Sequence, residues 1–461
     1  MRWLIRPDWK SVDMSNEDLI PAGSAEGAVF RRVAWRLMPF LFICLVFNWL
    51  DRVAVSFAHL QFGADLHISD TAFGLSVGLF SAGYLLCEIP SNLVMERWGA
   101  RRTLARIMII WGLVTVGMAF VQGPYSLYAT RTLLGMAEAG FFPGVILYLT
   151  YWFPSAYRAR ITSRFIMAIA VCGIVGGPSA TWIMTHLAGL WGWHGWQWLF
   201  LLGGLPPVVA GFLAFGWLAD KPDNARWLKK NEKIIIQQAM VREPSATIRP
   251  VRASLVSAFS NRTVWLLSLS YCLTITCTGN VVNFWVPSLL RAAGVQNLQQ
   301  LGLLSALPHA VGIGAMLLAC RHSDQHQERR WHFALGGALA MAGMLALPWI
   351  AHGTTETLFF LTVMVAGYLI ATAIFWSIPA GLLPAQDRAI GFALINCCGQ
   401  ISSMLVPVLI GFLKTRLGGF EVALSLVSLF VGFGVIVMLA MTARTARLPV
   451  SQPYSVMDSQ S

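Results

Sequence analysis

The chain has 461 residues, of which 56% are hydrophobic and only 12% are charged. A soluble protein of this length needs far more charged surface, so the composition excludes an ordinary soluble enzyme or binding module. The formal net charge is +12, but the basic residues lie in short clusters between apolar runs, which is not the pattern of a nucleic-acid-binding face.

Long apolar segments along the chain predict membrane-spanning helices, because a bilayer core of about 30 Å needs about 20 residues at about 1.5 Å each. The first half holds six such segments, at 37–58, 71–94, 104–122, 124–152, 165–188 and 197–219. The second half holds six more, at 263–290, 300–320, 332–351, 356–384, 389–413 and 420–443. These lengths exceed the strands of a membrane barrel. We therefore predict an all-α membrane protein of twelve transmembrane helices in two six-helix bundles.

The polar segments divide the chain into five predicted parts. These are a cytoplasmic N-terminal segment (1–36), an N-terminal six-helix bundle (37–219), a cytoplasmic central loop (220–262), a C-terminal six-helix bundle (263–443) and a cytoplasmic tail (444–461). Residues 225–243 of the central loop are amphipathic and are expected to lie on the inner membrane surface. No cleavable signal peptide is recognisable before the first span, and Met14 is an alternative start to Met1.

The distribution of basic residues predicts the orientation in the membrane. Of the 33 Lys and Arg, 28 fall in the N-terminal segment, the tail and the connections that follow even-numbered spans, with Arg106 at the start of the third span counted among them. The opposite side holds only Arg291, Lys414 and Arg416. This is the positive-inside bias, which places both termini in the cytoplasm of a cell whose inner (plasma) membrane holds the protein.

Two basic turns occupy matching places in the two halves. Residues 92–102 read NLVMERWGARR between spans 2 and 3, and residues 320–330 read CRHSDQHQERR between spans 8 and 9. A duplication of six spans explains this placement. Internal repeats are the usual architecture of secondary transporters, which bind their substrate near the membrane midplane between the halves.

Four charged residues well inside predicted spans stand out, namely Asp51, Arg52, Arg131 and Glu138. Each costs at least about 2.5–3.5 kcal/mol to insert, so each needs a reason to be there. Asp51 and Arg131 fall at a similar depth and are able to pair, while Arg131 and Glu138, seven residues apart, share one helix face. A guanidinium fork suits a carboxylate, so the group is consistent with a water-filled cavity for an anionic solute. A static cluster that fixes helix packing is the open alternative.

Uncharged polar residues supply further candidates for solute contact. Tyr84 lies in span 2, one turn before Glu88, for which a structural role is favoured. In the second half the candidates are Asn280, Asn283, Trp376, Ser377, Asn396 and Gln400. Each is able to bond a solute or another helix.

Several longer segments carry a resemblance to a known family. They are LDRVAVSFA (50–58), GYLLCEIPSNL (83–93), RTLLGMAEAGFFPGVILYLTYWFP (131–154), GWQWLFLLGGLPPVVAGF (195–212) and DKPDNARWL (220–228). With them the chain resembles the major facilitator superfamily, and more narrowly the anion:cation symporter family in the branch of bacterial tartrate and 4-hydroxyphenylacetate permeases. The turn ERWGARR resembles the loop 2–3 gating signature, through Glu96, Arg97, Gly99, Arg101 and Arg102, with Glu96 in place of the usual Asp.

The resemblance implies roles for individual residues. Arg52 would bind the substrate carboxylate, Asp51 and Glu138 would couple protons, and Arg131 would be their charge partner. Substrate contacts would come from Tyr84, Asn283, Trp376, Ser377 and Asn396. Span 5 (RFIMAIAVCGIVGGP, 164–178) is apolar where sugar-acid members tend to carry Gln, which favours an aromatic or short dicarboxylic acid.

The predicted function is therefore import of a small organic anion by proton symport, with the proton and the lipid bilayer as the other partners. The alternatives are an uncoupled facilitator, an anion exchanger and, from another class, a solute sensor that transports nothing. An enzyme is not expected, since the sequence has no HExxH or GxGD motif and no His or Cys grouping with metal-ligand spacing. No cofactor, metal or nucleic acid is expected, and the protein is predicted to be a monomer.

Overall fold

The computed structural model describes residues 25–242, 257–383 and 388–445, and all regular structure in these ranges is helical. Both candidate start sites and most of the predicted tail lie outside the described residues, as do parts of the central loop.

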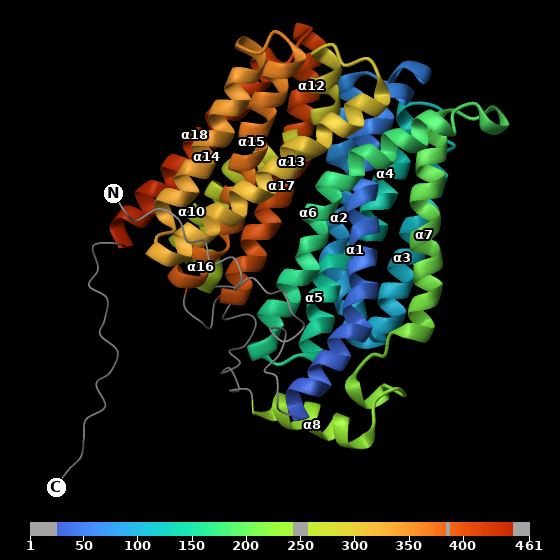
Figure 1. The fold of residues 1–461 in the computed structure, drawn as a ribbon, viewed down its shortest axis with the longest axis vertical. Coiled ribbons are helices and arrows are strands. Elements are labelled where there is room, and N and C mark those ends of the chain that lie inside the picture. Colours follow the sequence, from blue (N-terminus) through green and yellow to red (C-terminus); the bar gives the residue numbers. More distant parts are fainter. Residues whose placement is uncertain (1–24, 243–256, 384–387, 446–461) are drawn as a thin grey trace, which may run out of the picture.

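The helices before residue 220 pack together on one side of the molecule (Figure 1). They are α1 (Ala25–Asp65), α2 (Asp70–Trp98), α3 (Ala100–Met118), α4 (Pro124–Glu138), α5 (Phe141–Trp152), α6 (Ser155–His186), the short η2 (Leu190–Gly192) and α7 (Gly195–Trp217). The connection that follows contains η3 (Pro222–Asn224) and α8 (Lys230–Val241). We call this side the first bundle, and the end of the molecule that carries α8 the α8 end.

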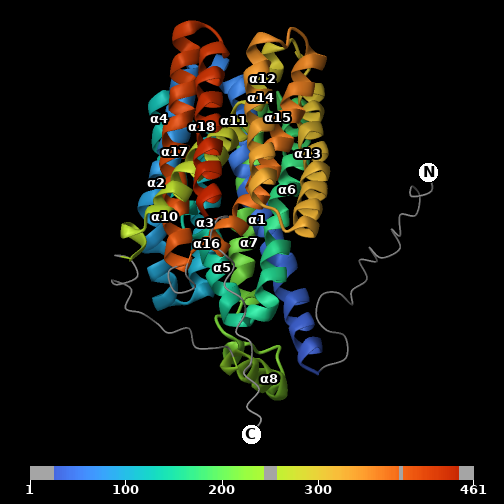
Figure 2. The same ribbon diagram turned by 90° about the vertical axis from the view of Figure 1, so that its left-hand side faces the viewer.

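The remaining helices form the second bundle beside the first (Figures 1 and 2). They are α10 (Arg262–Ser270), the π-helical turn η4 (Tyr271–Thr276), α11 (Cys277–Phe284), α12 (Val286–Ala292), α13 (Leu298–His326), α14 (Arg330–Trp349), α15 (Thr354–Phe375), α16 (Ser377–Leu382), α17 (Arg388–Leu417) and α18 (Glu421–Thr445).

Within the described residues, eleven helices or joined helices are long and apolar enough to cross a membrane. The sequence predicts twelve, and the difference is α3, which packs along α7 in the first bundle. It has 19 residues but carries Arg101, Arg102 and Arg106 near its start. α3 therefore differs from the other spans in the three charged residues near its start, and not in how it packs within the bundle.

Helix α1 is longer than the predicted span at 37–58, because it begins at Ala25 and ends at Asp65. Its first turns are held against α8 by two ion pairs. Arg32 Nη1 lies 2.9 Å from Glu232 Oε1, and Arg242 Nη1 lies 3.3 Å from Glu26 Oε2. Residues 25–36, predicted as part of the cytoplasmic N-terminal segment, thus form a helical extension of the first span.

The span formed by α4 and α5 is broken in its middle. Helix α4 ends at Glu138, Ala139 is extended (φ −56°, ψ 132°), and Gly140 adopts the left-handed conformation (φ 88°) that favours glycine. A Cβ atom at Gly140 would lie 2.4 Å from Ser91 Oγ, so close approach to α2 also demands glycine here. The GFFPG motif therefore interrupts the helix directly after a buried acid.

Helix α4 approaches α2 closely at Gly135, where a Cβ atom would lie 2.0 Å from the Phe80 carbonyl oxygen. We expect Gly135→Val to force these helices apart and to destabilise the protein by about 1–3 kcal/mol or more. The matched control is Gly203→Val, because nothing lies within 4 Å of a Cβ atom built at Gly203. A lower thermal midpoint for the first variant only, measured on purified protein in detergent, is the expected result. Equal midpoints would contradict this account of α2–α4 packing.

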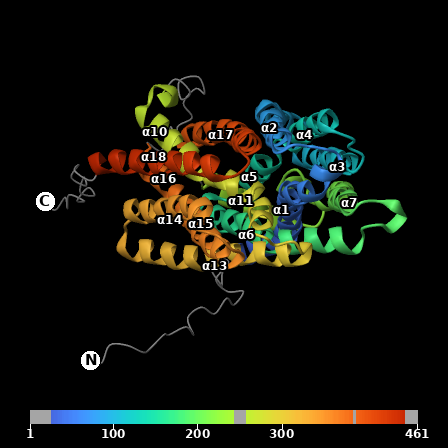
Figure 3. The ribbon, with the colours of Figure 1, turned by 90° about the horizontal axis from the view of Figure 1, so that it is seen from above.

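The two bundles meet along two helix pairs, α2 with α17 and α6 with α13 (Figure 3). Glycines allow the close approach. A Cβ atom at Gly74 would lie 2.2 Å from the Pro407 carbonyl oxygen, and one at Gly302 would lie 2.0 Å from Thr181 Oγ1. Both contact regions lie in the half of the molecule away from the α8 end.

Candidate functional site

The candidate site is centred on an ion pair between α1 and the broken end of α4. Arg52 Nε donates to Glu138 Oε1 at 2.6 Å, and Arg52 Nη2 contacts the same oxygen. The Glu138 side chain is fully buried, whereas the Arg52 side chain is 20% exposed. Glu138 Oε2 has no hydrogen-bond partner in the part of the chain that the structure describes. One carboxylate oxygen of Glu138 therefore binds the Arg52 guanidinium, while the other is available to accept a hydrogen bond.

The position of Glu138 at the end of a helix explains why it needs a cation. The C-terminus of a helix carries a partial negative charge, so a carboxylate in the last turn is unfavourable. Glu138 is the last residue of α4, and Arg52 supplies the compensating charge. Broken membrane helices of this kind form the substrate and ion sites of secondary transporters.

Aromatic rings line the Arg52 guanidinium. Its central carbon lies 5.1 Å from the centre of the Tyr84 ring, 5.3 Å from Phe80 and 5.4 Å from Trp49. Cation–π contacts of this length stabilise a desolvated guanidinium. The structure thus places Tyr84 beside Arg52, and both are residues predicted from the sequence to contact a substrate.

Asp51 and Arg131 lie buried in the same interior without forming a direct ion pair among the described contacts. Among the described residues, none of the Arg131 side-chain nitrogens has a hydrogen-bond partner, nor has Asp51 Oδ2. The Arg131 guanidinium instead lies 4.5 Å from the centre of the Phe80 ring, and it interacts electrostatically with both Asp51 and Glu138. The structure therefore brings the four charges together, but the close pair is Arg52–Glu138, not the Asp51–Arg131 pair considered from sequence.

The uncharged candidates of the second half lie on α11, α16 and α17 or at their ends. Trp376 occupies the break between α15 and α16, with its ring 5.2 Å from Tyr271 and 5.7 Å from Phe392. Ser377 Oγ donates to the Ile374 carbonyl at 2.6 Å. Asn283 and Asn396 are half-buried. Among the described contacts, no hydrogen bond or ion pair joins these residues to Arg52 or Glu138.

The fourth span of each half is broken. Span Pro124–Trp152 consists of α4 and α5, and span Thr354–Leu382 consists of α15 and α16; each has 29 residues. Interrupted segments in corresponding positions of two halves point to the binding site of a transporter. Glu138 and Trp376 lie at or next to these breaks.

Glu88 belongs near this site, although its position in the sequence favours a structural role. It is buried, its Oε2 makes no hydrogen bond with any residue that the structure describes, and it interacts electrostatically with Arg52. Its helix, α2, packs against α17 of the second bundle, and Cys397 of α17 lies within range of the Glu88 charge. The signal in the sequence is its spacing of four residues from Tyr84, which puts both on one face of α2.

The loop motif between α2 and α3 is hydrogen-bonded to Asp220, shortly after the end of α7, a residue not predicted from the sequence to belong to a site. The Arg101 backbone N–H donates to Asp220 Oδ1 at 2.9 Å. Gly99 has φ 87°, and a Cβ atom there would lie 2.5 Å from the same oxygen. Asp220 therefore accepts from a free N–H at the start of α3. The other motif residues are Glu96, Arg97 and Arg102, which lie beside this turn.

Two helical bundles that enclose buried charges at a broken span define a polytopic membrane transporter. A model of the Major Facilitator Superfamily matches residues 41–407. The chain belongs to this superfamily.

The chain is similar to several named transporters over most of its length. The chain is 37% identical over 421 residues to a putative tartrate transporter of Agrobacterium vitis, covering 91% of this chain and 96% of the relative. It is 36% identical over 422 residues to a quinolone resistance transporter of Acinetobacter baumannii, covering 92% and 96%. Among solved structures, a bacterial homolog of the human lysosomal transporter Spinster aligns with a TM-score of 0.69 at 18% identity, covering 91% of this chain and 95% of that one. The last likeness shows the fold alone.

Proposed function

We propose that the protein imports a small organic anion by proton symport, through alternating access of one site to the two sides of the membrane. The observation that carries the proposal is the Arg52–Glu138 ion pair, in which the arginine side chain is partly exposed and the glutamate side chain is fully buried. Such a pair is able to exchange one carboxylate for another. The substrate carboxylate takes the place of Glu138 on the guanidinium fork of Arg52.

Proton coupling follows from the loss of that partner. A carboxylate left buried without a cation costs several kcal/mol, so it is neutralised by binding a proton. In the proposed cycle the proton binds Glu138 at the oxygen that Arg52 does not hold. Asp51 is the second proton carrier, and Arg131 compensates the charge of the pair. Tyr84, Asn283, Trp376, Ser377 and Asn396 are the proposed substrate contacts.

The proposed topology counts α3 as the twelfth span. Its three arginines lie toward the α8 end, where headgroups and water are able to solvate them. The α8 end also carries most of the basic connections, so we assign it to the cytoplasm, together with both termini. We assign the protein to the inner (plasma) membrane of the cell, with the Glu96–Arg102 motif on the cytoplasmic side, where we assign it a role in gating.

The names of the relatives indicate which substrates to test first. Tartrate, named for one relative, is a short dicarboxylic acid, and the apolar character of α6, the fifth span, favours such an acid over a sugar acid. We therefore propose a dicarboxylic or aromatic monocarboxylic acid that presents one carboxylate to Arg52.

The test is uptake into proteoliposomes with and without an inside-alkaline pH gradient, after a thermal-shift screen of organic acids. A ligand stabilises the native state by mass action, by about 2.7 kcal/mol at 100 times its dissociation constant. We expect a carboxylate that raises the thermal midpoint also to accumulate against its gradient, with protons entering alongside. Uptake that only equilibrates, whatever the pH gradient, would identify a facilitator. Uptake that requires a counter-anion inside would identify an exchanger.

A further inference from the structure

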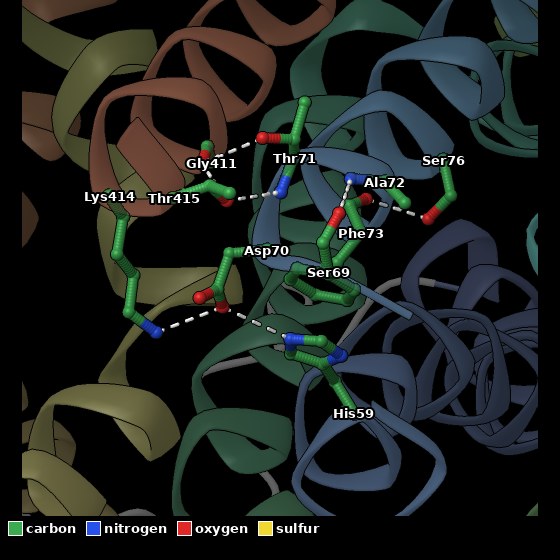
Figure 4. Close-up of polar contacts among 10 residues, drawn as sticks. All are labelled: His59, Ser69, Asp70, Thr71, Ala72, Phe73, Ser76, Gly411, Lys414 and Thr415. Atoms are coloured by element: carbon green, nitrogen blue, oxygen red, sulfur yellow. Dashed lines mark hydrogen bonds and ion pairs between the residues drawn. The ribbon is translucent and has the colours of Figure 1, made fainter. Parts of the chain in front are cut away.

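An ion pair joins the two bundles at the end of the molecule away from α8. Lys414 Nζ of α17 donates to Asp70 Oδ1 of α2 at 2.9 Å, and His59 Nε2 of α1 lies 3.3 Å from the same oxygen (Figure 4). Asp70 and His59 belong to the first bundle and Lys414 to the second. The Asp70–Lys414 bond must therefore break whenever the bundles separate at this end.

Both charged groups are held in place by the ends of their own helices. Asp70 is the first residue of α2, after the N-cap Ser69, which accepts from the Ala72 N–H at 3.2 Å. Lys414 lies in the last turn of α17. A helix stabilises an anion at its N-terminus and a cation at its C-terminus. The two helix ends therefore present complementary charges across the seam.

A second pair of hydrogen bonds crosses the seam beside the ion pair. The Thr71 N–H donates to Thr415 Oγ1 at 3.1 Å, and Thr71 Oγ1 donates to the Gly411 carbonyl at 3.2 Å (Figure 4). A Cβ atom at Gly411 would lie 2.2 Å from the Asp70 carbonyl oxygen. The glycine lets the two helix ends approach closely enough for all of these bonds to form.

Aromatic rings next to the ion pair also pack across the bundle boundary. Trp285, between α11 and α12, meets Phe73 of α2 edge to face with ring centres 5.4 Å apart. Phe73 stacks on His59 at 4.1 Å, while Lys414 Nζ lies 4.6 Å from the centre of the Phe420 ring. Phe73 and Trp285 are fully buried. The ion pair thus lies against a dry layer of rings shared by both bundles.

We propose that Asp70, Lys414 and His59 form the latch of the outer gate, and that the Phe73–Trp285 contact forms its seal. His59 is a positioning residue, because it holds the Asp70 carboxylate from within the first bundle and aims it at Lys414. Opening toward the outside requires the Asp70–Lys414 bond to break, so its strength sets the balance between outward-open and outward-closed states. This inference rests on the alternating access of the proposed function.

The test measures the width of the outer end without any substrate. Spin labels are placed on cysteines introduced at Tyr125 and Glu356, exposed residues of the two bundles at this end, in a chain whose native cysteines are replaced. We expect Asp70→Asn and Lys414→Met each to raise the long-distance population roughly tenfold, because a charge-assisted bond is lost. Lys414→Arg, which keeps a positive charge in the last turn of α17, is expected to keep the distances of the parent.

The matched control is Arg416→Met, which removes an exposed positive charge two residues from Lys414. It is expected to leave the distances unchanged. Parent-like distances in both Asp70→Asn and Lys414→Met would overturn the latch, and so would a Lys414→Arg variant as open as Lys414→Met. If one of the two neutral variants does not fold, the other decides together with Lys414→Arg. Because no solute is involved, a latch that fails this test leaves proton-coupled uptake untouched, and uptake that fails leaves the distance result standing.

Discussion

Arg52→Gln is expected to abolish uptake, lowering its initial rate by at least about 100-fold. Removing one partner of a buried charge pair costs about 2–5 kcal/mol, largely because the other charge is left alone. Here the loss is double, since the variant removes the partner of Glu138 and the proposed ligand of the substrate carboxylate. The measurement is the initial rate of uptake into proteoliposomes at equal amounts of folded protein.

Arg52→Lys tests whether the positive charge at this position is sufficient or whether the planar guanidinium group is required. Lysine keeps the positive charge but offers no planar fork, so it is expected to restore folding more fully than uptake. The matched control is Arg226→Gln, an exposed arginine of the connection after α7, which is expected to transport normally. Uptake by Arg52→Gln at a rate close to that of the control would remove Arg52 from the substrate site.

Much of the fold follows from the sequence, because hydrocarbon leaves few choices for an apolar segment. Each apolar run forms a helix, since a helix satisfies its backbone groups internally. The break at 139–140 is also signalled, by the GFFPG motif. The ends of helices are harder to predict. Helix α1 continues to Ala25 because Glu26 and Arg32 are held by partners in the connection that carries α8, and contacts with so distant a segment leave no local signal.

The candidate site, likewise, is only partly predictable from the sequence. The cost of charge in a membrane singles out Asp51, Arg52, Arg131 and Glu138 from sequence, and the structure gathers them. Their pairing was not predictable from depth alone, because the rotation of α1 relative to α4 decides which charge Glu138 meets. The latch at Asp70 was not predicted, since each of its residues lies at a span end, where charges are ordinary. Only the packing of α2 on α17 gives these residues a partner in the other bundle.

Glu138→Gln is expected to uncouple transport from the proton while leaving the protein folded. Glutamine has nearly the shape of glutamate and its amide oxygen is still able to accept from Arg52, but it binds no proton near neutral pH.

A one-unit pH gradient supports at most about tenfold accumulation per proton, since 1.4 kcal/mol is a factor of ten. We expect this variant to lose that accumulation and to keep exchange of internal for external substrate, measured in the same proteoliposomes. Glu356→Gln, which neutralises an exposed acid, is the matched control and is expected to accumulate normally. If Glu138→Gln concentrates its substrate as well as this control does, the proton is carried elsewhere, and Asp51 becomes the residue to neutralise next.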